Sequence, residues 1–216
     1  MNRKKRVGQY LILTAFLAAV LLISYWLFFD GGRRRAIAGI PEPVQTQTTG
    51  STSKSVGGYD VTITYGYEYD IRALVVHTQS YSSLQLIDRL SPVDLALAWG
   101  DVAANNTKID FHWTQRGRWY YWNVDNYMDI EPLGGVDGVN RQSANTHIIP
   151  ASSSVKRIVK DIKTGDHVRL KGYLVDVDAV KPDGSTFWWY SSTTREDTGD
   201  GACEVFYVTR AEILDS

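Results

Sequence analysis

The side chains best suited to proton transfer are one histidine and a polar run distant from it in the sequence. His147 lies in an Asn-Thr-His-Ile-Ile-Pro stretch, where a loop enters a short extended segment before a helix. An imidazole held there can act as a general base. The densest polar run, SSTTREDTGDGACE at 191–204, adds Arg195, Asp197 and Glu204 as candidate catalytic partners. A histidine bonded to backbone and a self-bonded polar hairpin loop explain the same residues without chemistry.

Other chemistries leave weaker patterns. Ser191 or Ser192 could be a nucleophile activated by His147, but no G-x-S-x-G elbow surrounds either serine. Asp197 and Asp200 could ligate Ca²⁺, although Asp-x-x-Asp-Gly falls far short of an EF-hand ligand set. The four histidines lack metal-ligand spacing and the chain has one cysteine. We therefore expect no metal site and no cofactor.

The single cysteine, Cys203, excludes an intramolecular disulfide. A lone cysteine usually packs as a small buried apolar residue. An unpaired thiol could also link two chains.

Two aromatic runs offer a binding surface. Trp-Tyr-Tyr-Trp at 119–122 and Phe-Trp-Trp-Tyr at 187–190 would carry aromatic side chains on both faces of a strand. One face can pack the core, whereas the other must be covered or exposed to a sugar, a peptide or a protein. The candidate ligand-binding residues are Trp119, Trp122, Trp188 and Trp189. Core filling on two faces of a central sheet is the alternative.

The elements that must position these residues are mostly strands. Alternating and apolar patterns predict strands near 59–65, 71–78, 109–113, 118–123, 167–177, 187–191 and 203–210. Arg116-Gly117 predicts the turn of the clearest hairpin. The strands indicate an α+β fold: one compact domain built on a curved antiparallel sheet that could close into a barrel, with two or three short helices.

The predicted helices are short. The best lies at 152–163, with serines to cap it, an apolar stripe from Val155 to Ile162 and Gly165 to stop it. Ser91-Pro92 is typical of a helix start, and 84–90 predicts a helical turn. The Gly- and Pro-containing stretch 124–143 predicts a long loop.

The stretch GDHVRLKGYLVDV at 165–177 resembles the opening strands of small OB-fold-like barrels, in which a glycine lets a long strand bend between two sheets. Gly172 would hold that place, and a bulge or sharp coil is expected there. The whole layout of basic tail, anchor, stalk and β-rich domain resembles uncharacterised bacterial single-pass membrane-anchored proteins. That resemblance implies a cell-envelope setting and no particular activity.

An uncharged apolar run at 10–29 predicts a transmembrane helix, because twenty residues span about 30 Å. The run ends in Trp-Leu-Phe-Phe-Asp, which is a poor cleavage site, so we expect an uncleaved anchor. Residues 1–9 are then a basic cytoplasmic tail, 30–58 a flexible linker, and 59–216 a soluble β-rich domain.

Charge separates the two ends of the chain. Residues 1–56 hold eight Lys/Arg and two acidic residues, leaving 15 basic and 22 acidic residues and a formal charge of −7 for the remainder. Such a domain is repelled by phosphate backbones, so we expect no nucleic-acid partner. The basic tail favours a cytoplasmic N-terminus and an extracytoplasmic domain, whereas the arginines at 33–35 favour the opposite orientation.

These observations predict a membrane-tethered envelope protein, held in the lipid bilayer by 10–29. Its domain would bind a membrane or envelope protein, or a ligand, without catalysis. The alternative is an envelope hydrolase that uses His147 as general base with the 191–204 loop.

Overall fold

One 22-residue strand, β3 (Tyr59–Ser80), is the element to which most others attach in the computed structural model. The structure describes residues 13–14, 16–21, 34–194 and 202–215. β3 pairs in antiparallel fashion with β1 (Val44–Gln47), β2 (Ser51–Val56), β4 (Val93–Ala98) and β8 (His167–Val180). Because β3 is long, different parts of it pair with different strands of the sheet.

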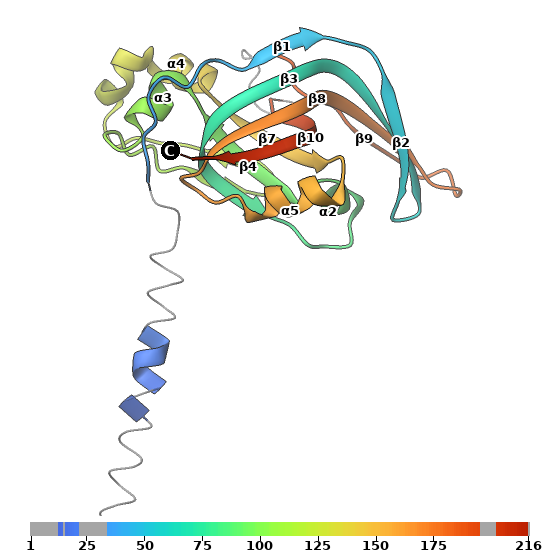
Figure 1. Cartoon of the computed structure of the whole chain (residues 1–216), viewed down its shortest axis with the longest axis horizontal. Helices are drawn as coiled ribbons and strands as arrows, with labels where there is room; N and C mark the ends of the chain where they lie inside the picture. The colour runs from blue at the N-terminus through green and yellow to red at the C-terminus, as the bar shows by residue number, and fades with distance from the viewer. Residues whose placement is uncertain (1–12, 15, 22–33, 195–201, 216) are drawn as a thin grey trace, which may run out of the picture. The chain divides into compact units, whose positions relative to one another are not determined.

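Five strands close into a ring (Figure 1). Their order is β3–β4–β7–β10–β8, with β8 pairing back onto β3; β7 is Ser143–Pro150 and β10 is Glu204–Leu214. β7 and β10 are parallel and the other pairs antiparallel. The predicted α+β class and curvature are confirmed, but the sheet is mixed. A parallel pair forms because the chain passes through a helix and two strands between β7 and β10.

Beyond the ring, β3 and β8 continue side by side as a ribbon that we call the arm. The arm comprises β2, the first part of β3 (59–65), the last part of β8 (175–180), and β9 (Thr186–Trp189). Figure 1 shows β2 and β9 at the same end of the ring. The register of the four strands is continuous, so side chains alternate strictly between the two faces of the arm.

The stretch 30–58, expected to be a flexible linker, contains strands β1 and β2. Before them, the Ile37 N–H donates to the Ala103 carbonyl at 3.0 Å, and Ile40 is buried. These Thr- and Ser-rich strands need little apolar surface, because the open edge of the long β3 supplies their backbone hydrogen bonds. The compact unit accordingly begins at Arg34 rather than at Tyr59.

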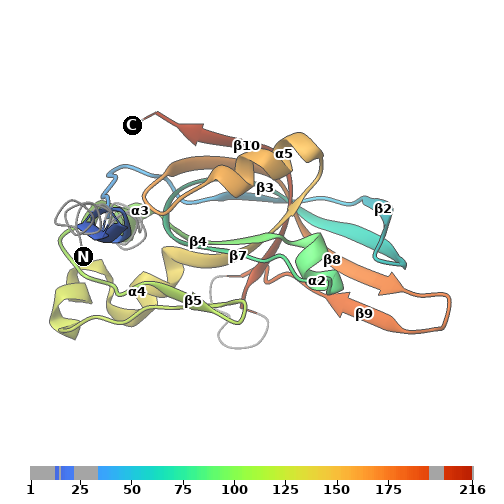
Figure 2. The same ribbon diagram turned by 90° about the horizontal axis from the view of Figure 1, so that it is seen from below.

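The best predicted helix is confirmed as α5 (Ser153–Asp161). The Ser152 hydroxyl accepts a bond from the Val155 N–H at 3.2 Å, and Gly165 follows the helix with a φ of +93°. Figure 2 shows α5 beside β10. The predicted turn at 84–90 is confirmed as α2 (Leu86–Leu90).

Two predictions of local structure were wrong. The stretch after Ser91-Pro92 forms strand β4, followed by the short helix α3 (Gly100–Asn105). All six β4 residues are buried, so tertiary pairing outweighs the local helix signal. The predicted loop at 124–143 contains a 3₁₀ helix, η1 (Tyr127–Leu133), and helix α4 (Gly135–Arg141), because Gly134 takes a left-handed conformation between them.

The structure has a hairpin here, β5 (Thr114–Arg116) and β6 (Trp119–Tyr121), which forms a separate two-stranded sheet. The strand predicted at 118–123 is confirmed in shorter form, but the strand predicted at 109–113 was wrong, because the first strand begins only at Thr114. The two-residue turn of the hairpin has positive φ at both Gly117 (60°) and Arg118 (73°), which is the type I′ pattern. A non-glycine residue in the left-handed region costs free energy, so the position of Arg118 needs an explanation.

Apolar side chains pack on both sides of the ring strands. One cluster includes Leu95, Ile148 and Phe206, together with the stripe of α5. A second cluster gathers Ile149 and Val205 with α2 and one face of the arm. The side chains of β7 and β10 therefore point alternately into two apolar clusters, so a polar residue on either face of these strands is buried.

The N-terminal unit, Met1–Arg33, is separate from the compact unit. Its described residues 13, 14 and 16–21 are helical. No helix within the described residues is both long and apolar enough to span a bilayer. The tail predicted at 1–9 and most of the anchor predicted at 10–29 lie outside the described residues.

Candidate functional site

A buried carboxylate and an imidazole meet on the face of β4 and β7 that points out of the ring. Asp94 and His147 are directly opposed in the antiparallel register. His147 Nδ1 lies 3.0 Å from Asp94 Oδ2, with side-chain exposures of 4% and 0%. The two atoms are within ion-pair distance but lack hydrogen-bond alignment. An adjacent carboxylate favours one tautomer and orientation of an imidazole.

The left-handed turn of the β5–β6 hairpin brings an arginine onto this pair. Arg118 Nη1 lies 2.8 Å from Asp94 Oδ1, and Nη2 lies 2.6 Å from Asp88 Oδ1. Nη2 also donates to the Ser91 carbonyl at 2.8 Å. The Arg118 side chain is only 12% exposed. These bonds offset the strain of the turn and explain why a non-glycine residue occupies it.

Aromatic rings enclose the charged groups. The Arg118 Cζ lies 3.8 Å from the centre of the Tyr81 ring and 5.6 Å from that of Trp189. The Trp189 ring in turn lies 4.6 Å from the His147 ring. Burial and the charge of Asp94 both raise the pKa of the Tyr81 hydroxyl, so this group stays protonated at neutral pH. The rings lower the local dielectric and strengthen each charge interaction.

The charges of this cluster are unequal. One guanidinium faces two carboxylates, so the group carries −1 when His147 is neutral and is balanced when His147 takes a proton. Burial of the Asp88 carboxyl would raise its pKa, but hydrogen bonds from Ser83 and Arg118 outweigh burial and lower the pKa.

A second polar cluster lies inside the ring, behind the first. The Tyr69 hydroxyl donates to Glu204 Oε1 at 2.8 Å, and the Thr146 hydroxyl donates to Oε2 at 3.0 Å. Tyr69 is on β3, which is not a neighbour of β10, so this bond crosses the interior. Glu204 is 1% exposed. The Glu204 carboxylate therefore links β10 to β3 across the interior and to the neighbouring strand β7.

The structure separates the candidate catalytic residues. In the parallel register, Glu204 pairs with Thr146 and Val205 with His147, so Glu204 and His147 point to opposite faces. The Ser191 hydroxyl donates to the Ser192 carbonyl, and the Ser192 hydroxyl to the Thr194 carbonyl. Neither serine has a hydrogen bond to His147 within the described part of the chain. Arg195 and Asp197 lie outside the described residues.

The four candidate aromatic residues occupy different environments. Trp119 is half-buried on β6. Trp122 packs against the larger core cluster, and its Nε1 donates to Asn140 Oδ1 at 3.0 Å. Trp189 faces inward on β9, over His147. Trp188 faces outward and is 69% exposed, so it alone of the four offers most of its ring to solvent.

Trp188 stands on the outer face of the arm. Its ring centre lies 5.5 Å from that of Tyr190, which is 49% exposed. A shallow hollow of about 240 Å³ is lined by these two rings and by the acidic side chains of Asp60 and Asp178. The Tyr190 hydroxyl donates to Asp178 Oδ1 at 3.0 Å, and this bond raises the pKa of the hydroxyl. The other lining residues are Thr62, Ala179, Val180, Thr186 and Phe187.

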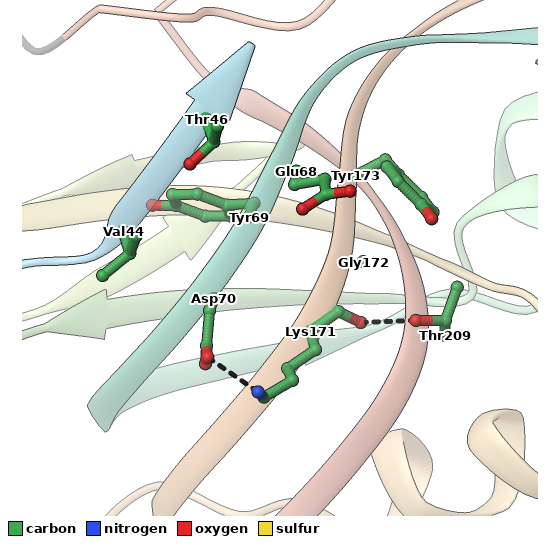
Figure 3. Close-up of a pocket in the computed structure, with 9 residues that line it drawn as sticks. All are labelled: Val44, Thr46, Glu68, Tyr69, Asp70, Lys171, Gly172, Tyr173 and Thr209. Atoms are coloured by element: carbon green, nitrogen blue, oxygen red, sulfur yellow. Dashed lines mark hydrogen bonds and ion pairs between the residues drawn. The ribbon is translucent and has the colours of Figure 1, made fainter. Parts of the chain in front are cut away.

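A second hollow, of about 400 Å³, lies where β1, β3, β8 and β10 meet (Figure 3). Gly172 forms part of its wall, and Asp70 and Lys171 face each other across it, with Nζ 2.9 Å from Oδ2. Hydrogen bonds from Arg169, opposed by burial and aided by Lys171, lower the pKa of Asp70 to about 2. Neighbouring cations satisfy the Asp70 carboxylate, and Glu68 adds a further carboxylate to the lining of this hollow.

Sequence reasoning missed Asp94, Arg118 and Asp88. Asp94 is the one charged residue in the apolar strand VDLALA, which was a usable signal. Arg118 follows the predicted turn glycine, but nothing local links it to residues some thirty positions earlier. Within the described residues, no group of three or more His, Cys, Asp or Glu side chains could hold a metal ion.

The chain matches no protein-family model, no curated protein and no solved structure.

Proposed function

We propose that this chain is a membrane-tethered binding domain whose arm recognises a lysine- or arginine-bearing segment of a partner protein. The observation that carries the proposal is Trp188, a tryptophan 69% exposed beside Tyr190 on the last strand of the sheet. A large aromatic pair held in the open loses the free energy that burial would give it. Such pairs are typical of recognition surfaces.

The charge of the hollow selects the class of ligand. Asp60 and Asp178 line it, and none of the described lining residues is a lysine or an arginine. An ammonium or guanidinium group can lie over an indole face while a carboxylate neutralises it, which contributes about 0.5–2 kcal/mol per contact. An acidic ligand would meet two like charges. The formal charge of −7 on residues 57–216 adds long-range attraction for a basic segment.

The edge of the arm offers a way to hold that segment. β9 is the terminal strand of the sheet order, and no described strand pairs with its outer edge. An extended peptide can add to such an edge, so that backbone bonds supply affinity and alternate side chains supply specificity. A basic side chain of the added strand would then reach Trp188.

The setting is part of the same proposal. The apolar run 10–29 would anchor the chain and the basic tail would keep the N-terminus in the cytoplasm, which places the arm outside. A reporter fused after Ser216 tests the orientation, and reporter activity confined to the cytoplasm would refute it. The resemblance of 165–177 to the opening strands of OB-type barrels stays a prediction; in the structure this stretch forms most of β8, the fourth of the ring strands along the chain. The positions of Ser191 and Ser192 give the hydrolase alternative no support.

The binding test uses full-length protein in detergent with fluorescent oligolysine, oligoarginine and oligoglutamate peptides and a neutral oligosaccharide. We expect the cationic peptides to bind, with affinity that falls as salt rises. Trp188→Ala and Asp178→Asn should each weaken binding about tenfold, which is about 1.4 kcal/mol. Tyr121→Ala is the matched control, because Tyr121 is a similarly exposed aromatic residue on β6.

Equal binding by the Trp188→Ala and Tyr121→Ala variants would exclude the arm as the site. Binding of the oligosaccharide with no cationic preference would contradict the charge argument, even if Trp188 were required.

A further inference from the structure

The two faces of the arm carry opposite charge. On the outer face, the carboxylates of Asp60 and Asp178 line the hollow already described. The inner face packs on the second apolar cluster, and there β2 presents an ammonium group. Lys54 is directly opposed to the buried Val61 of β3, and directly opposed residues of an antiparallel pair share one face. The sheet therefore separates the acidic hollow from a basic side chain on its other side.

Three stacked tyrosine rings lie beside Lys54. Its Nζ lies 5.9 Å from the centre of the Tyr207 ring. The Tyr65 ring centre lies 4.2 Å from that of Tyr173 and 5.8 Å from that of Tyr207, and all three residues are half-buried. Burial raises the pKa of the Tyr65 and Tyr207 hydroxyls. Both hydroxyls are therefore protonated at neutral pH and can donate hydrogen bonds.

The first turn of α5 brings a second lysine to the same place. Tyr207 is in register with Ile149 on β7, and α5 begins a few residues after Ile149. Lys156 lies in that first turn and is exposed. Burial and then the charge of Lys156 lower the pKa of Lys54. The two ammonium groups are thus close enough to repel each other.

This pair of lysines has no acidic partner in the part of the chain that the structure describes. No carboxylate there forms an ion pair with Lys54 or Lys156. Glu68 opposes Tyr173 in the register, yet it too forms no ion pair with either lysine. A neighbouring carboxylate would raise the pKa of Lys54, whereas that pKa is lowered. Positive charge without a counter-charge beside half-buried rings costs free energy, which a bound anion would offset.

A third lysine of the arm shows the contrast. The Lys181 Nζ lies 4.6 Å from the centre of the Tyr59 ring. Hydrogen bonds from Ser185 and, to a smaller extent, the charge of Lys181 lower the pKa of Asp183. Lys181 therefore has a carboxylate close by, although its ammonium group also lies over a tyrosine.

We propose that Lys54 and Lys156, with the tyrosine hydroxyls beside them, bind a phosphate monoester, carried by a lipid headgroup or by a small soluble molecule. A phosphate monoester bears about −1.5 to −2 charge at pH 7, which matches two ammonium groups better than a carboxylate does. Lysine binds phosphate as a point charge, and protonated hydroxyls supply further donors. This inference is independent of the proposed recognition of cationic segments, because the two sites use opposite faces of the arm.

The test measures the rate at which sulfosuccinimidyl acetate acetylates each lysine of full-length protein in detergent, followed by mass spectrometry. Inorganic phosphate is the soluble probe, and sodium chloride at the same ionic strength is the reference. We expect phosphate to protect Lys54. At about ten times Kd only about a tenth of the sites is free, so the rate should fall about tenfold. Lys181 is the control within the same sample, and its rate should not change.

The lipid source is tested in nanodiscs of phosphatidylcholine with and without phosphatidate. Protection of Lys54 by phosphatidate alone would support the proposal with a lipid headgroup as the ligand. Protection by inorganic phosphate, with or without phosphatidate, would support it with a soluble ligand.

Two variants of α5 test the second lysine. Lys156→Met should raise the Kd for the protecting probe about tenfold, because one charged donor is lost. Lys160→Met is the matched control, since Lys160 is also exposed on α5, and its Kd should equal that of wild type.

The proposal would be overturned if neither probe protected Lys54, or if Lys54 and Lys181 were protected equally. Chloride that protects as well as phosphate would overturn it too, because screening alone would then explain the effect. A wild-type Kd in Lys156→Met would have the same consequence.

Discussion

Replacing Arg118 with alanine tests whether burial makes the Arg118–Asp94 ion pair important for stability. Arg118 Nη1 lies 2.8 Å from Asp94 Oδ1, and the two side chains are 12% and 0% exposed. Arg34 Nη1 lies 2.8 Å from Asp110 Oδ2, with exposures of 48% and 47%. The equal distances make the second pair a suitable control for exposure; Arg34 also donates to the carbonyls of Asn106 and Ile109.

The magnitudes follow from what each substitution leaves behind. Arg118→Ala leaves Asp94 enclosed without its cation and also removes the partner of Asp88, so we expect a loss of about 3–5 kcal/mol in the free energy of unfolding. Arg34→Ala leaves a carboxylate that water can solvate, so we expect a loss below about 1 kcal/mol. The Arg118→Met, Asp94→Leu double variant should lose less than Arg118→Ala, because only Asp88 is then left without its cation.

Urea unfolding of the full chain in detergent, followed by tryptophan fluorescence and circular dichroism, gives these values. The reasoning would be refuted by equal losses for Arg118→Ala and Arg34→Ala. It would also fail if the double variant were the least stable of the three.

Three further perturbations test the ring. Gly172→Ala should cost about 3 kcal/mol or more in urea unfolding, since a Cβ would meet the Tyr207 carbonyl oxygen at 1.9 Å. Gly66→Ala, whose Cβ would lie 3.6 Å from its nearest neighbour, is the control and should stay within about 1 kcal/mol. The Asp70 pKa of about 2 lies below the ordinary value, so its contribution of about 1–2 kcal/mol is present above pH 4 and is lost as pH falls toward 2. Asp70→Asn should flatten that part of the stability profile, and an unchanged slope would contradict the assignment. Tyr69→Phe should lower the melting temperature through a loss of about 1–3 kcal/mol, because Glu204 loses a donor inside the ring; a melt like that of wild type would argue against this.

Local patterns predicted the elements that are stabilised locally. Ser152 caps α5, the apolar stripe of α5 packs on the core, and Gly117 lies in the turn between β5 and β6. In each case the decisive interactions join residues a few positions apart. The curvature expected near Gly172 also appears, although the irregularity lies in β10, where the register shifts between Val208 and Arg210.

The remaining elements depend on partners far away in the sequence. The strand 93–98 forms because β3 and β7 flank it, and the Ser- and Thr-rich strands β1 and β2 form because β3 has an open edge. The role of His147 as a general base stays a prediction; its neighbour Asp94, and Arg118 bound to Asp94, come from other elements. Because pairing register decides these contacts, a single sequence indicates the residue types and not the constellation.

The alternation of β9 has a mechanical consequence. Trp188 and Trp189 are adjacent, yet one faces solvent over the hollow of the arm and the other covers His147. Successive side chains of a strand point to opposite faces but share one backbone, so a displacement of the β9 backbone would move both rings. A ligand that shifts β9 when it binds Trp188 would therefore also change how Trp189 covers the His147 ring.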